Sequence, residues 1–472
     1  MDFSLLTTEI LVALIGLLVL VVGLVLPDRG KQLVGKLSLL ALAIVLGYAL
    51  IAFPREASYF NGIYQVDVFG NYFKILFLIA GILVMLSASK YIKRFAAKSS
   101  EFYGLMILAT LGMMVLSASG DFITMYIGLE LMTISFYILT AYLQSDKRSS
   151  EAGLKYLILG AISSAVLLFG MSLVYAMTGT TIISEIAGAW TMQPAMAAGL
   201  VMIIAGFAFK ISVIPFHMWA PDIYQGAPIP VTTYLAVGSK AAAFAALVRV
   251  FMLAFPPGSI SFNWNIILAV LAVLTMVIGN LIALTQKNVK RLLAYSSIAQ
   301  AGYILVGLVA ANTYGLKGVL FYAMLYVFSN TGAFAVATAV EVDAGSTDID
   351  AFNGLAKRSP MLAAIMTVCM LSLAGIPPMA GFVGKFYLFS GAIQAGYLWV
   401  AIIGLVMSMV SVYYYLGVAK AMYIGVSIDE NPIKLDVPAQ MALWACLAGT
   451  LLIGIYPGPL SNFVQTAISM FL

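Results

Sequence analysis

Long apolar runs separated by short polar stretches repeat along the whole chain. Most of them are close to the roughly 20 residues that an α-helix needs to cross a bilayer. The pattern predicts an all-α polytopic membrane protein of about 14 transmembrane helices. The runs lie at residues 8–26, 36–53, 72–89, 103–119, 122–143, 154–177, 195–215, 229–254, 264–284, 291–311, 315–340, 361–395 (interrupted), 397–424 and 438–458.

Composition supports the membrane assignment. Of 472 residues, 63% are hydrophobic and 9% are charged, whereas soluble domains carry about 25% charged residues. The net charge of +5 comes without a basic stripe, so we expect the lipid bilayer and no nucleic acid as a partner. The first run lacks a basic leader and a small-residue cleavage site, and we interpret it as a retained helix.

The basic residues between the runs predict an orientation. Alternate loops carry seventeen and two lysines and arginines, and the cytoplasmic side of a membrane protein carries the excess. This asymmetry places both termini on the outer face of a bacterial cytoplasmic (inner) membrane. Five basic residues fall inside the runs and are left unexplained by the rule, namely Lys74, Lys210, Lys240, Arg249 and Lys385.

Three of these lysines are candidates for function. A charge at the bilayer centre costs about 2.5–3.5 kcal/mol on insertion scales, so such residues usually face a protein interior or a wet cavity. Lys210, Lys240 and Lys385 lie well inside their runs, as does Glu130, the only acidic residue that the pattern places at that depth. Structural ion pairs or snorkelling side chains are the alternative, and we assign Lys74 and Arg249, near the ends of their runs, to that class.

Two runs are interrupted by proline, each with a lysine nearby. The first break contains Pro215, which follows Lys210 by five residues. The second contains Pro377 and Pro378, and Lys385 follows Pro378 by seven residues. Broken helices at matching places in two halves indicate a transport site. The breaks fall in the seventh and twelfth runs, so we expect an inverted repeat of two five-helix units, helices 4–8 and 9–13.

The repeat predicts four parts of the chain. They are residues 1–100 with helices 1–3, residues 101–255 and 256–425 with the two repeats, and residues 426–472 with helix 14. The lone histidine, His217, follows the first break. It is either a proton relay, because imidazole titrates near neutral pH, or a hydrogen-bonding residue at the helix break.

Buried lysines and one glutamate suit proton transfer. Burial disfavours the charged form of an amine, and a nearby carboxylate favours it. Glu130 and Lys210 could thus form a switch that releases a proton towards Lys240 and then Lys385. Polar residues that could hold bridging water are Ser239, Ser296, Ser297, Gln300 and Tyr303. The sequence carries no nucleotide, haem, iron–sulfur or metal motif, so the energy source is expected in another protein or an ion gradient.

Four stretches resemble the antiporter-like membrane subunits of respiratory complex I, which are shared with multi-subunit sodium/proton antiporters. They are Tyr126 to Ile138, Phe209 to Thr233 (FKISVIPFHMWAPDIYQGAPIPVTT), Asn288 to Gly302 (NVKRLLAYSSIAQAG) and Leu373 to Tyr387 (LAGIPPMAGFVGKFY). The resemblance covers nearly the whole chain. It implies that Glu130, Lys210, Lys240 and Lys385 are the residues of proton translocation.

Within this family the chain is most similar to the subunit N branch of complex I. The L branch has an added lateral helix, and the M branch has a glutamate where this chain has Lys385. The resemblance implies no cofactor in this chain, with flavin, iron–sulfur clusters and quinone in partner subunits. It also implies neighbouring antiporter-like and small membrane subunits as partners. A subunit of a multi-subunit cation/proton antiporter is the alternative function, and a purely structural scaffold is disfavoured because it needs no mid-span charge.

Overall fold

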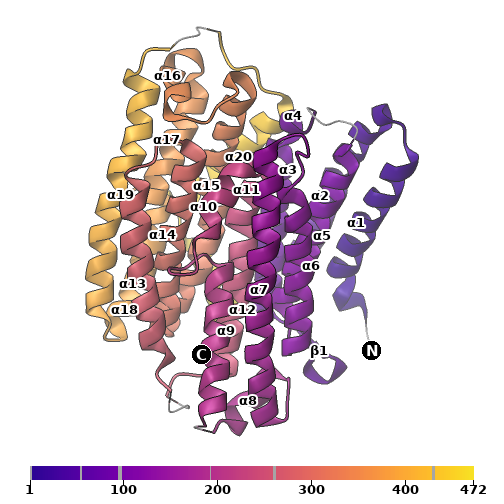
Figure 1. Cartoon of the computed structure of the whole chain (residues 1–472), viewed down its shortest axis with the longest axis vertical. Coiled ribbons are helices and arrows are strands. Elements are labelled where there is room, and N and C mark those ends of the chain that lie inside the picture. The colour runs from indigo at the N-terminus through magenta and orange to yellow at the C-terminus, as the bar shows by residue number, and fades with distance from the viewer. Residues whose placement is uncertain are drawn as a thin grey trace.

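The protein is described by a computed structural model that covers residues 3–53, 56–93, 98–191, 193–258, 262–427 and 431–471. Within these ranges, twelve helices are long and apolar enough to cross a membrane, and two further apolar helices are shorter. Each short helix continues into a second half after a break, so the expected 14 spans are confirmed. Figure 1 shows them as a bundle of roughly parallel rods, with α1 and α2 standing at one side.

The uninterrupted spans follow the apolar runs of the sequence. They are α1 (Thr7–Val25), α2 (Asp28–Ile51), α3 (Val68–Ser87), α5 (Ser99–Ala118), α6 (Phe122–Thr140), α7 (Lys147–Thr178), the span of α11 (Ile229–Tyr234) and α12 (Lys240–Leu253), α13 (Trp264–Ala283), α14 (Val289–Ala310), α15 (Thr313–Ala344), α19 (Leu398–Ile424) and α20 (Val437–Ile455).

The two broken spans are the seventh and the twelfth, as the sequence predicts. The seventh consists of α9 (Pro194–Lys210) and the short α10 (Trp219–Gly226). The twelfth consists of α17 (Pro360–Ala374) and α18 (Ala380–Gln394). The five-helix offset between the breaks fits the expected inverted repeat. The division of the chain into residues 1–100, 101–255, 256–425 and 426–472 stays a prediction.

Short polar residues and glycines set where the helices begin and end. Asp121 accepts a hydrogen bond from Thr124 N at 2.9 Å and so caps α6, and Asn288 caps α14 in the same way. Such side chains satisfy amides that a helix start leaves unbonded. Gly179 and Gly375 end α7 and α17 with φ of 74° and 85°, a left-handed conformation that a glycine adopts without steric cost.

Several small elements were not predicted from the apolar runs. They are the antiparallel strands β1 (Ala57–Tyr59) and β2 (Tyr64–Val66), the helices α4 (Ser89–Ile92), α8 (Ile183–Ile186), α16 (Leu355–Arg358) and α21 (Gly458–Ile468), and 3-10 turns at Phe3–Leu6, Phe60–Gly62, Ala187–Ala189, Ile349–Phe352 and Ser469–Phe471. They are too short or too polar to stand out as apolar runs.

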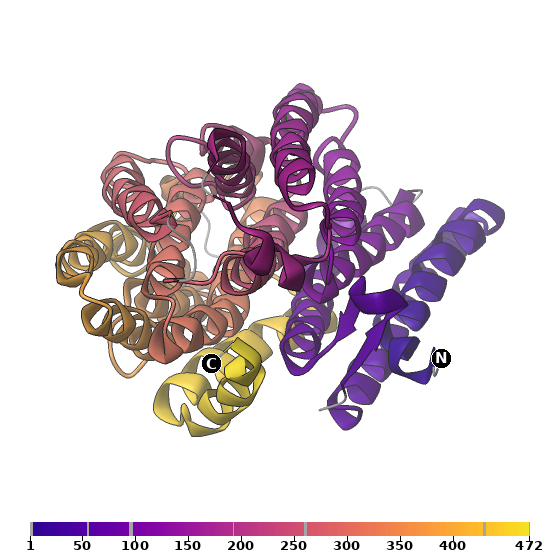
Figure 2. The same ribbon diagram turned by 90° about the horizontal axis from the view of Figure 1, so that it is seen from below.

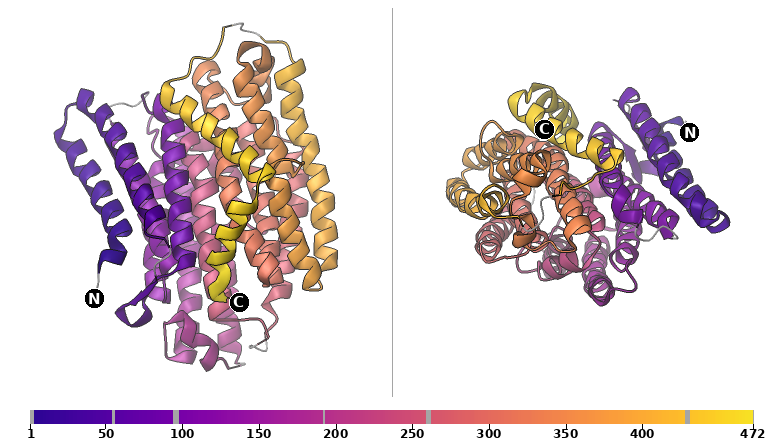
Figure 3. Two further views of the ribbon diagram at one scale, coloured as in Figure 1. Left: turned by 180° about the vertical axis from the view of Figure 1, so that it is seen from behind. Right: turned by 90° about the horizontal axis from the view of Figure 1, so that it is seen from above.

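The bundle has a buried centre and an apolar rim. α14 is buried along its whole apolar window and α15 nearly so, whereas α1, α2 and α20 are mostly exposed. Figure 2 shows α1 and α2 at one edge of the molecule and α18 and α19 towards the opposite edge. Figure 3 shows α20 crossing the back of the bundle obliquely. Polar groups on α14 therefore face protein on every side, and this helix passes through the candidate site.

Candidate proton-translocation site

Lys210 is the last residue of the first broken half-helix and is buried. It is 3% exposed, and its Nζ donates a hydrogen bond to Ser164 Oγ on α7 at 3.0 Å. A cation is favoured at the C-terminal end of a helix, where the macrodipole is negative. The fold therefore places this ammonium group where the half-helix stabilises it.

Glu130 lies on α6 and does not pair directly with Lys210. Its carboxylate accepts a long 3.4 Å contact from Thr133 Oγ1, and its Oε1 is buried without a hydrogen-bond partner among the described residues. The carboxylate is still close enough to act electrostatically on Lys210. The predicted Glu130–Lys210 switch stays a prediction.

Protein groups satisfy the backbone that the first break frees. Val213 N donates to Ala208 O at 2.8 Å, and Ile214 N donates to Thr275 Oγ1 on α13 at 3.0 Å. Trp219 Nε1, at the start of α10, donates back to Phe209 O at 2.9 Å. Irregular backbone at membrane depth is tolerated only where such partners exist, so the break is a built feature of the fold.

Aromatic rings fill the interval between Lys210 and Lys240. The ring centroids of Phe209 and Trp219 are 5.3 Å apart, and those of Trp219 and Tyr224 are 6.1 Å apart. Lys240 Nζ lies 5.7 Å from the centroid of Tyr224. Within the described part of the chain, no hydrogen bond joins Lys210 to Lys240. The Tyr224 hydroxyl is the polar group of these three rings that could support proton transfer.

Lys240 sits directly after a π-helical turn, Leu235–Ser239, that links α11 to α12. Such turns often mark functional sites in helices. Lys240 is 4% exposed, and its Nζ donates to Ser297 Oγ at 2.6 Å and to Ser297 O at 3.0 Å. A cavity of about 10 Å³ beside it is also lined by Gln300, which is roughly the space for the centre of one water molecule.

Gln300 links this cavity to the second break. Its Nε2 donates to Leu373 O at 2.9 Å and to the Tyr415 hydroxyl at 3.2 Å. Its Oε1 accepts a hydrogen bond from the Tyr322 hydroxyl at 2.6 Å. Ser296 extends the network through a 2.5 Å hydrogen bond with Tyr415. The predicted water-bridging residues Ser296 and Gln300 thus share Tyr415 as a partner, whereas Ser297 bonds to Lys240.

Lys385 reaches back to the end of the other half-helix. Its Nζ donates to Leu373 O at 3.0 Å, to Ala374 O at 3.1 Å and to Ser408 Oγ at 2.7 Å, and it lies 4.4 Å from the Tyr303 ring centroid. The carbonyl of Leu373 therefore accepts from both Lys385 and Gln300. This shared acceptor brings Gln300 next to Lys385, and the small cavity lined by Ser297 and Gln300 completes a series of polar groups from Lys240 to Lys385.

His217 lies in the first break and remains apart from the three lysines. It is half-buried, and its Nδ1 has no hydrogen-bond partner in the part of the chain that the structure describes. The alternative of a hydrogen-bonding residue at the break also stays open. The role of His217 as a relay stays a prediction.

Lys74 and Arg249 do not snorkel, but are packed inside the protein in structural ion pairs, the other possibility in their assignment. Lys74 is 2% exposed and forms an ion pair with Glu9, whose carboxylate also accepts from the Tyr64 hydroxyl at 2.6 Å. Arg249 pairs with Asp67 at 2.8 Å. Glu9 is therefore a second carboxylate within an apolar run, and it is more deeply buried than Glu130. The partners lie more than fifty residues away in the sequence, so no local pattern could reveal them.

Lys290, which the charge count places among the cytoplasmic loop residues, is buried at the start of a helix, and the side of the membrane on which it lies stays a prediction. It is 4% exposed in the first turn of α14, and its Nζ donates to Ala227 O at 3.0 Å. Its position at the edge of an apolar run made it look like a topology signal. The structure adds it to Lys210, Lys240 and Lys385 as a further buried lysine.

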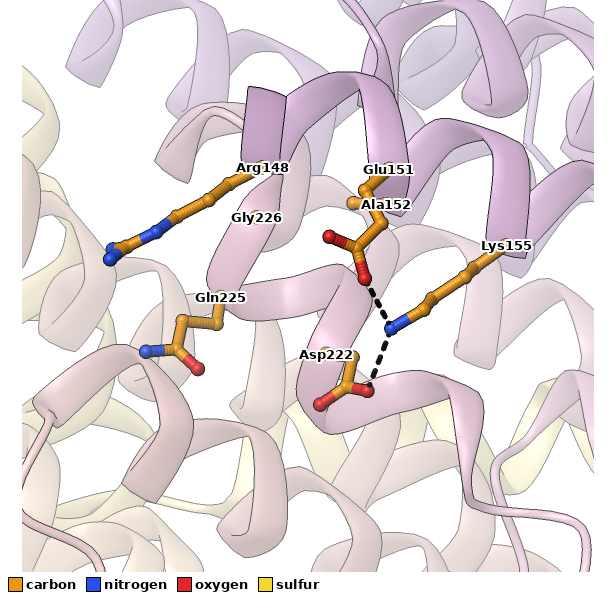
Figure 4. A pocket seen from close by; sticks show the side chains of 7 residues that line it. All are labelled: Arg148, Glu151, Ala152, Lys155, Asp222, Gln225 and Gly226. Carbon is orange, nitrogen blue, oxygen red and sulfur yellow. Dashed lines mark hydrogen bonds and ion pairs between the residues drawn. The ribbon is translucent and has the colours of Figure 1, made fainter. Parts of the chain in front are cut away.

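A polar pocket of about 320 Å³ opens near this lysine between α7 and α10. Figure 4 shows Lys155 reaching towards both Glu151 and Asp222, at 2.7 and 3.3 Å, while the Arg148 and Gln225 side chains extend to the other side. Among the described residues, no cluster of histidine, cysteine, aspartate or glutamate could hold a metal ion.

A 14-span bundle with two broken helices and a buried line of lysines defines an antiporter-like polytopic membrane protein. Residues 119–411 match the family described as NADH:quinone oxidoreductase/Mrp antiporter, transmembrane. The chain belongs to this family. The match spans both broken helices and all of the predicted site residues.

Relatives with the same length support this placement. The chain is 51% identical to NADH-quinone oxidoreductase subunit N of Desulfitobacterium hafniense, covering 99% of this chain and 98% of that protein. It is also 51% identical to subunit N of Heliobacterium modesticaldum, covering 99% of each. A chain from respiratory complex I of Thermus thermophilus with bound aureothin superposes with a TM-score of 0.83 at 35% identity, covering 96% of this chain and 98% of that one.

Proposed function

We propose that this protein is a proton-translocating subunit N of a bacterial NADH–quinone oxidoreductase. The observation that carries the proposal is the polar path from Lys240 through Ser297, Gln300 and the Leu373 carbonyl to Lys385. The lysine amines can hold protons, and water in the small cavity beside Ser297 and Gln300 can carry them, whereas a scaffold gains nothing from buried lysines that cost free energy.

Each predicted residue has a distinct role in this proposal. Lys210 takes a proton when Glu130 approaches it and releases the proton when the carboxylate withdraws. Lys240 holds the proton at the centre of the bundle, and Lys385 receives it at the end of the second half-helix. His217 is a possible additional relay beside the first break.

The exposed stripe that holds Glu130 suggests a partner. Ile127 and Ile134, one turn before and after Glu130 on α6, are 58% and 52% exposed. A carboxylate on an apolar membrane-facing stripe is unfavourable unless a neighbouring protein covers it. We infer that another membrane subunit packs there, either an antiporter-like subunit or one of the small membrane subunits that lead to the quinone module.

The energy for transport comes from other subunits in this proposal. Flavin, iron–sulfur clusters and quinone lie in partner proteins, and this chain holds no redox centre. The charge asymmetry of the loops supports insertion in the cytoplasmic (inner) membrane with both termini on the outer face. A multi-subunit sodium/proton antiporter is the alternative that the family description also names, and the 51% identity to subunit N relatives favours the oxidoreductase.

Purification of the tagged chain in mild detergent, followed by mass spectrometry, tests the assembly. Co-purifying flavin and iron–sulfur subunits with NADH-dependent quinone reduction would support the proposal. A set of membrane proteins without redox subunits would overturn it in favour of the antiporter.

Substitution of Lys240 tests the chemistry in the purified complex. In Lys240→Met we expect NADH-driven proton uptake into proteoliposomes to fall by about 10²-fold or more, the order of a lost acid–base group. Lys420→Met, on the exposed face of α19, is the matched control and should pump normally. Equal pumping by both variants, with equal assembly, would contradict the proposed path.

A further inference from the structure

The burial of Lys290 is not explained by the helix that carries it. Lys290 is the second residue of α14, next to its positive N-terminal end. A helix macrodipole disfavours a cation there, unlike the C-terminal positions that Lys210 and Lys385 occupy. The 4% exposure of Lys290 thus has two costs, desolvation and the dipole. Such a placement requires a reason outside α14.

The face of α14 that carries Lys290 also carries the partner of Lys240. Ser297 follows Lys290 by seven residues, close to two helical turns, and the two residues are about 10.5 Å apart along the axis. Ser297 Oγ accepts the 2.6 Å hydrogen bond from Lys240, and Gln300 continues the polar face one turn later. Lys290, Ser297 and Gln300 thus share one face of α14, with Leu293 and Ala294 between Lys290 and Ser297.

The short helix α10 spans the distance between the two lysines. Its C-terminal neighbour Ala227 provides the carbonyl that Lys290 binds, and three residues earlier the ring of Tyr224 faces Lys240 at 5.7 Å. The Tyr224 hydroxyl is buried and has no hydrogen-bond partner in the described part of the chain. This hydroxyl is therefore available to a proton or water that moves between Lys290 and Lys240.

Lys290 also has a connection to the surface. Glu341 Oε1, at the end of α15, lies 3.9 Å from Lys290 Nζ, and the glutamate side chain is 21% exposed. Gly226, next to Ala227, lines the polar pocket of Figure 4. Arg291 joins this pocket to α14 through 3.0 Å contacts with Asp222 and Gln225.

We propose that Lys290, supplied through Glu341, is the proton-uptake residue that loads Lys240. The proposal rests on the proposed function. A proton from bulk water passes by way of the Glu341 carboxylate to the neutral amine of Lys290. The resulting ammonium gives a proton, through the Tyr224 hydroxyl or a water beside it, to the neutral amine of Lys240. Each proton that leaves Lys290 is replaced from the aqueous side, so charge and protons balance.

A purely structural role for Lys290 makes a different prediction. In that role the ammonium only caps the carbonyl end of α10, and any permanent cation with N–H donors would serve. Arginine keeps the charge and the donors but is not deprotonated in proteins. The substitution Lys290→Arg therefore separates a cap, which needs only the donor, from a proton carrier, which must release its proton.

The experiment measures NADH-driven proton uptake per assembled complex in proteoliposomes, with the NADH–quinone activity of the uncoupled complex as the assembly standard. We expect Lys290→Arg to assemble and to lose about tenfold or more in proton uptake. Lys287→Arg, an exposed position three residues earlier, is the matched control and should resemble the unchanged protein. Normal uptake by Lys290→Arg would overturn the proposal and leave Lys290 as a structural cap of α10.

Two further variants keep the outcomes distinguishable. If Lys290→Arg and Lys240→Arg both pump normally, the proposed function itself fails. If Lys290→Arg pumps normally and Lys240→Arg does not, only the uptake role of Lys290 is refuted. If Lys290→Arg fails to assemble, Glu341→Gln decides, since Glu341 is part-exposed and amide replacement keeps its shape. A fall of about tenfold in Glu341→Gln would support uptake through this pair, and unchanged uptake would refute it.

Discussion

The two intervals of the lysine line are built from different chemistry. Between Lys210 and Lys240 lie the rings of Phe209, Trp219 and Tyr224. Between Lys240 and Lys385 lie polar groups: Lys240 bonds to Ser297, Ser297 and Gln300 line one small cavity, and Gln300 and Lys385 both bond to the Leu373 carbonyl. A hydrogen-bonded interval passes protons by small rearrangements, whereas an aromatic one must first admit water. We therefore expect the first interval to act as the gate and the second as the conductor.

The two helix breaks differ in the hydrogen bonds that their lysines make. Each places an ammonium group at the negative C-terminal end of a half-helix. Lys210 belongs to the half-helix that it terminates, and it donates to one side chain, Ser164. Lys385 comes from the following half-helix and donates to two freed carbonyls and to Ser408. The ammonium group is thus hydrogen-bonded to the backbone of the break only in the second half of the molecule.

The largest contrast is expected between Lys385→Met and Lys210→Met. Both should abolish proton transport, because both remove an amine from the line. Lys385→Met removes three hydrogen bonds from the second break, at about 0.5–1.5 kcal/mol for each, although Leu373 O keeps Gln300 and Ala374 O keeps Ser408 as donors. Lys210→Met removes only one, to a hydroxyl that can rotate to another acceptor. Thermal unfolding of the purified complex, followed for this subunit, should show a larger loss of stability for Lys385→Met.

Lys420→Met is the control for both substitutions, because this lysine is exposed on α19. It should leave the unfolding temperature and the transport rate unchanged. An equal loss of stability in Lys210→Met and Lys385→Met would show that the two breaks are equivalent, and the comparison between them would fail.

A second, smaller effect is expected when the conducting interval is cut. Gln300→Leu keeps the size of the side chain but removes the amide group, which donates to the same Leu373 carbonyl as Lys385. We expect proton transport to fall by about 10²-fold, as for other lost proton-transfer groups, with NADH–quinone activity of the uncoupled complex retained. Gln286→Leu, at the end of α13, is the matched control. Near-normal transport in Gln300→Leu would mean that protons bypass the amide.

Much of the fold and part of the site could be predicted from the sequence. The apolar runs locate the spans because the bilayer sets their length, and proline locates both breaks because it removes a backbone donor. Lys210, Lys240 and Lys385 stand out because a charge inside an apolar run is costly. The roles of these residues, and of Glu130 and His217, stay predictions.

Other features depend on contacts between distant segments. The pairing of Lys74 with Glu9 joins α3 to α1, and no sequence feature near either residue predicts its partner. Lys290 looks like a loop residue because its run begins beside it, and only the packing of α10 and α14 buries it. The π-helical turn before Lys240 also escapes prediction, since its residues are as apolar as those of an ordinary helix.

The smallest effect is expected from the removal of single hydroxyls beside Lys240 and Gln300. Tyr224 supplies the hydroxyl of the aromatic interval, whereas Tyr322 is one of several polar groups around Gln300. Tyr224→Phe should slow proton transport by up to about tenfold, because the interval offers little to replace that hydroxyl. Tyr322→Phe should cost about twofold, because Gln300 keeps its bonds to Leu373 and Tyr415 and redundant networks tolerate a single loss.

The two tyrosine variants are matched in chemistry, burial and size of the change, so the ratio of their transport rates is the informative quantity. Both rates are measured in proteoliposomes at equal content of assembled complex. A Tyr322→Phe rate below that of Tyr224→Phe would reverse the assignment: the amide network would then be the restrictive interval, and water would cross the aromatic one readily.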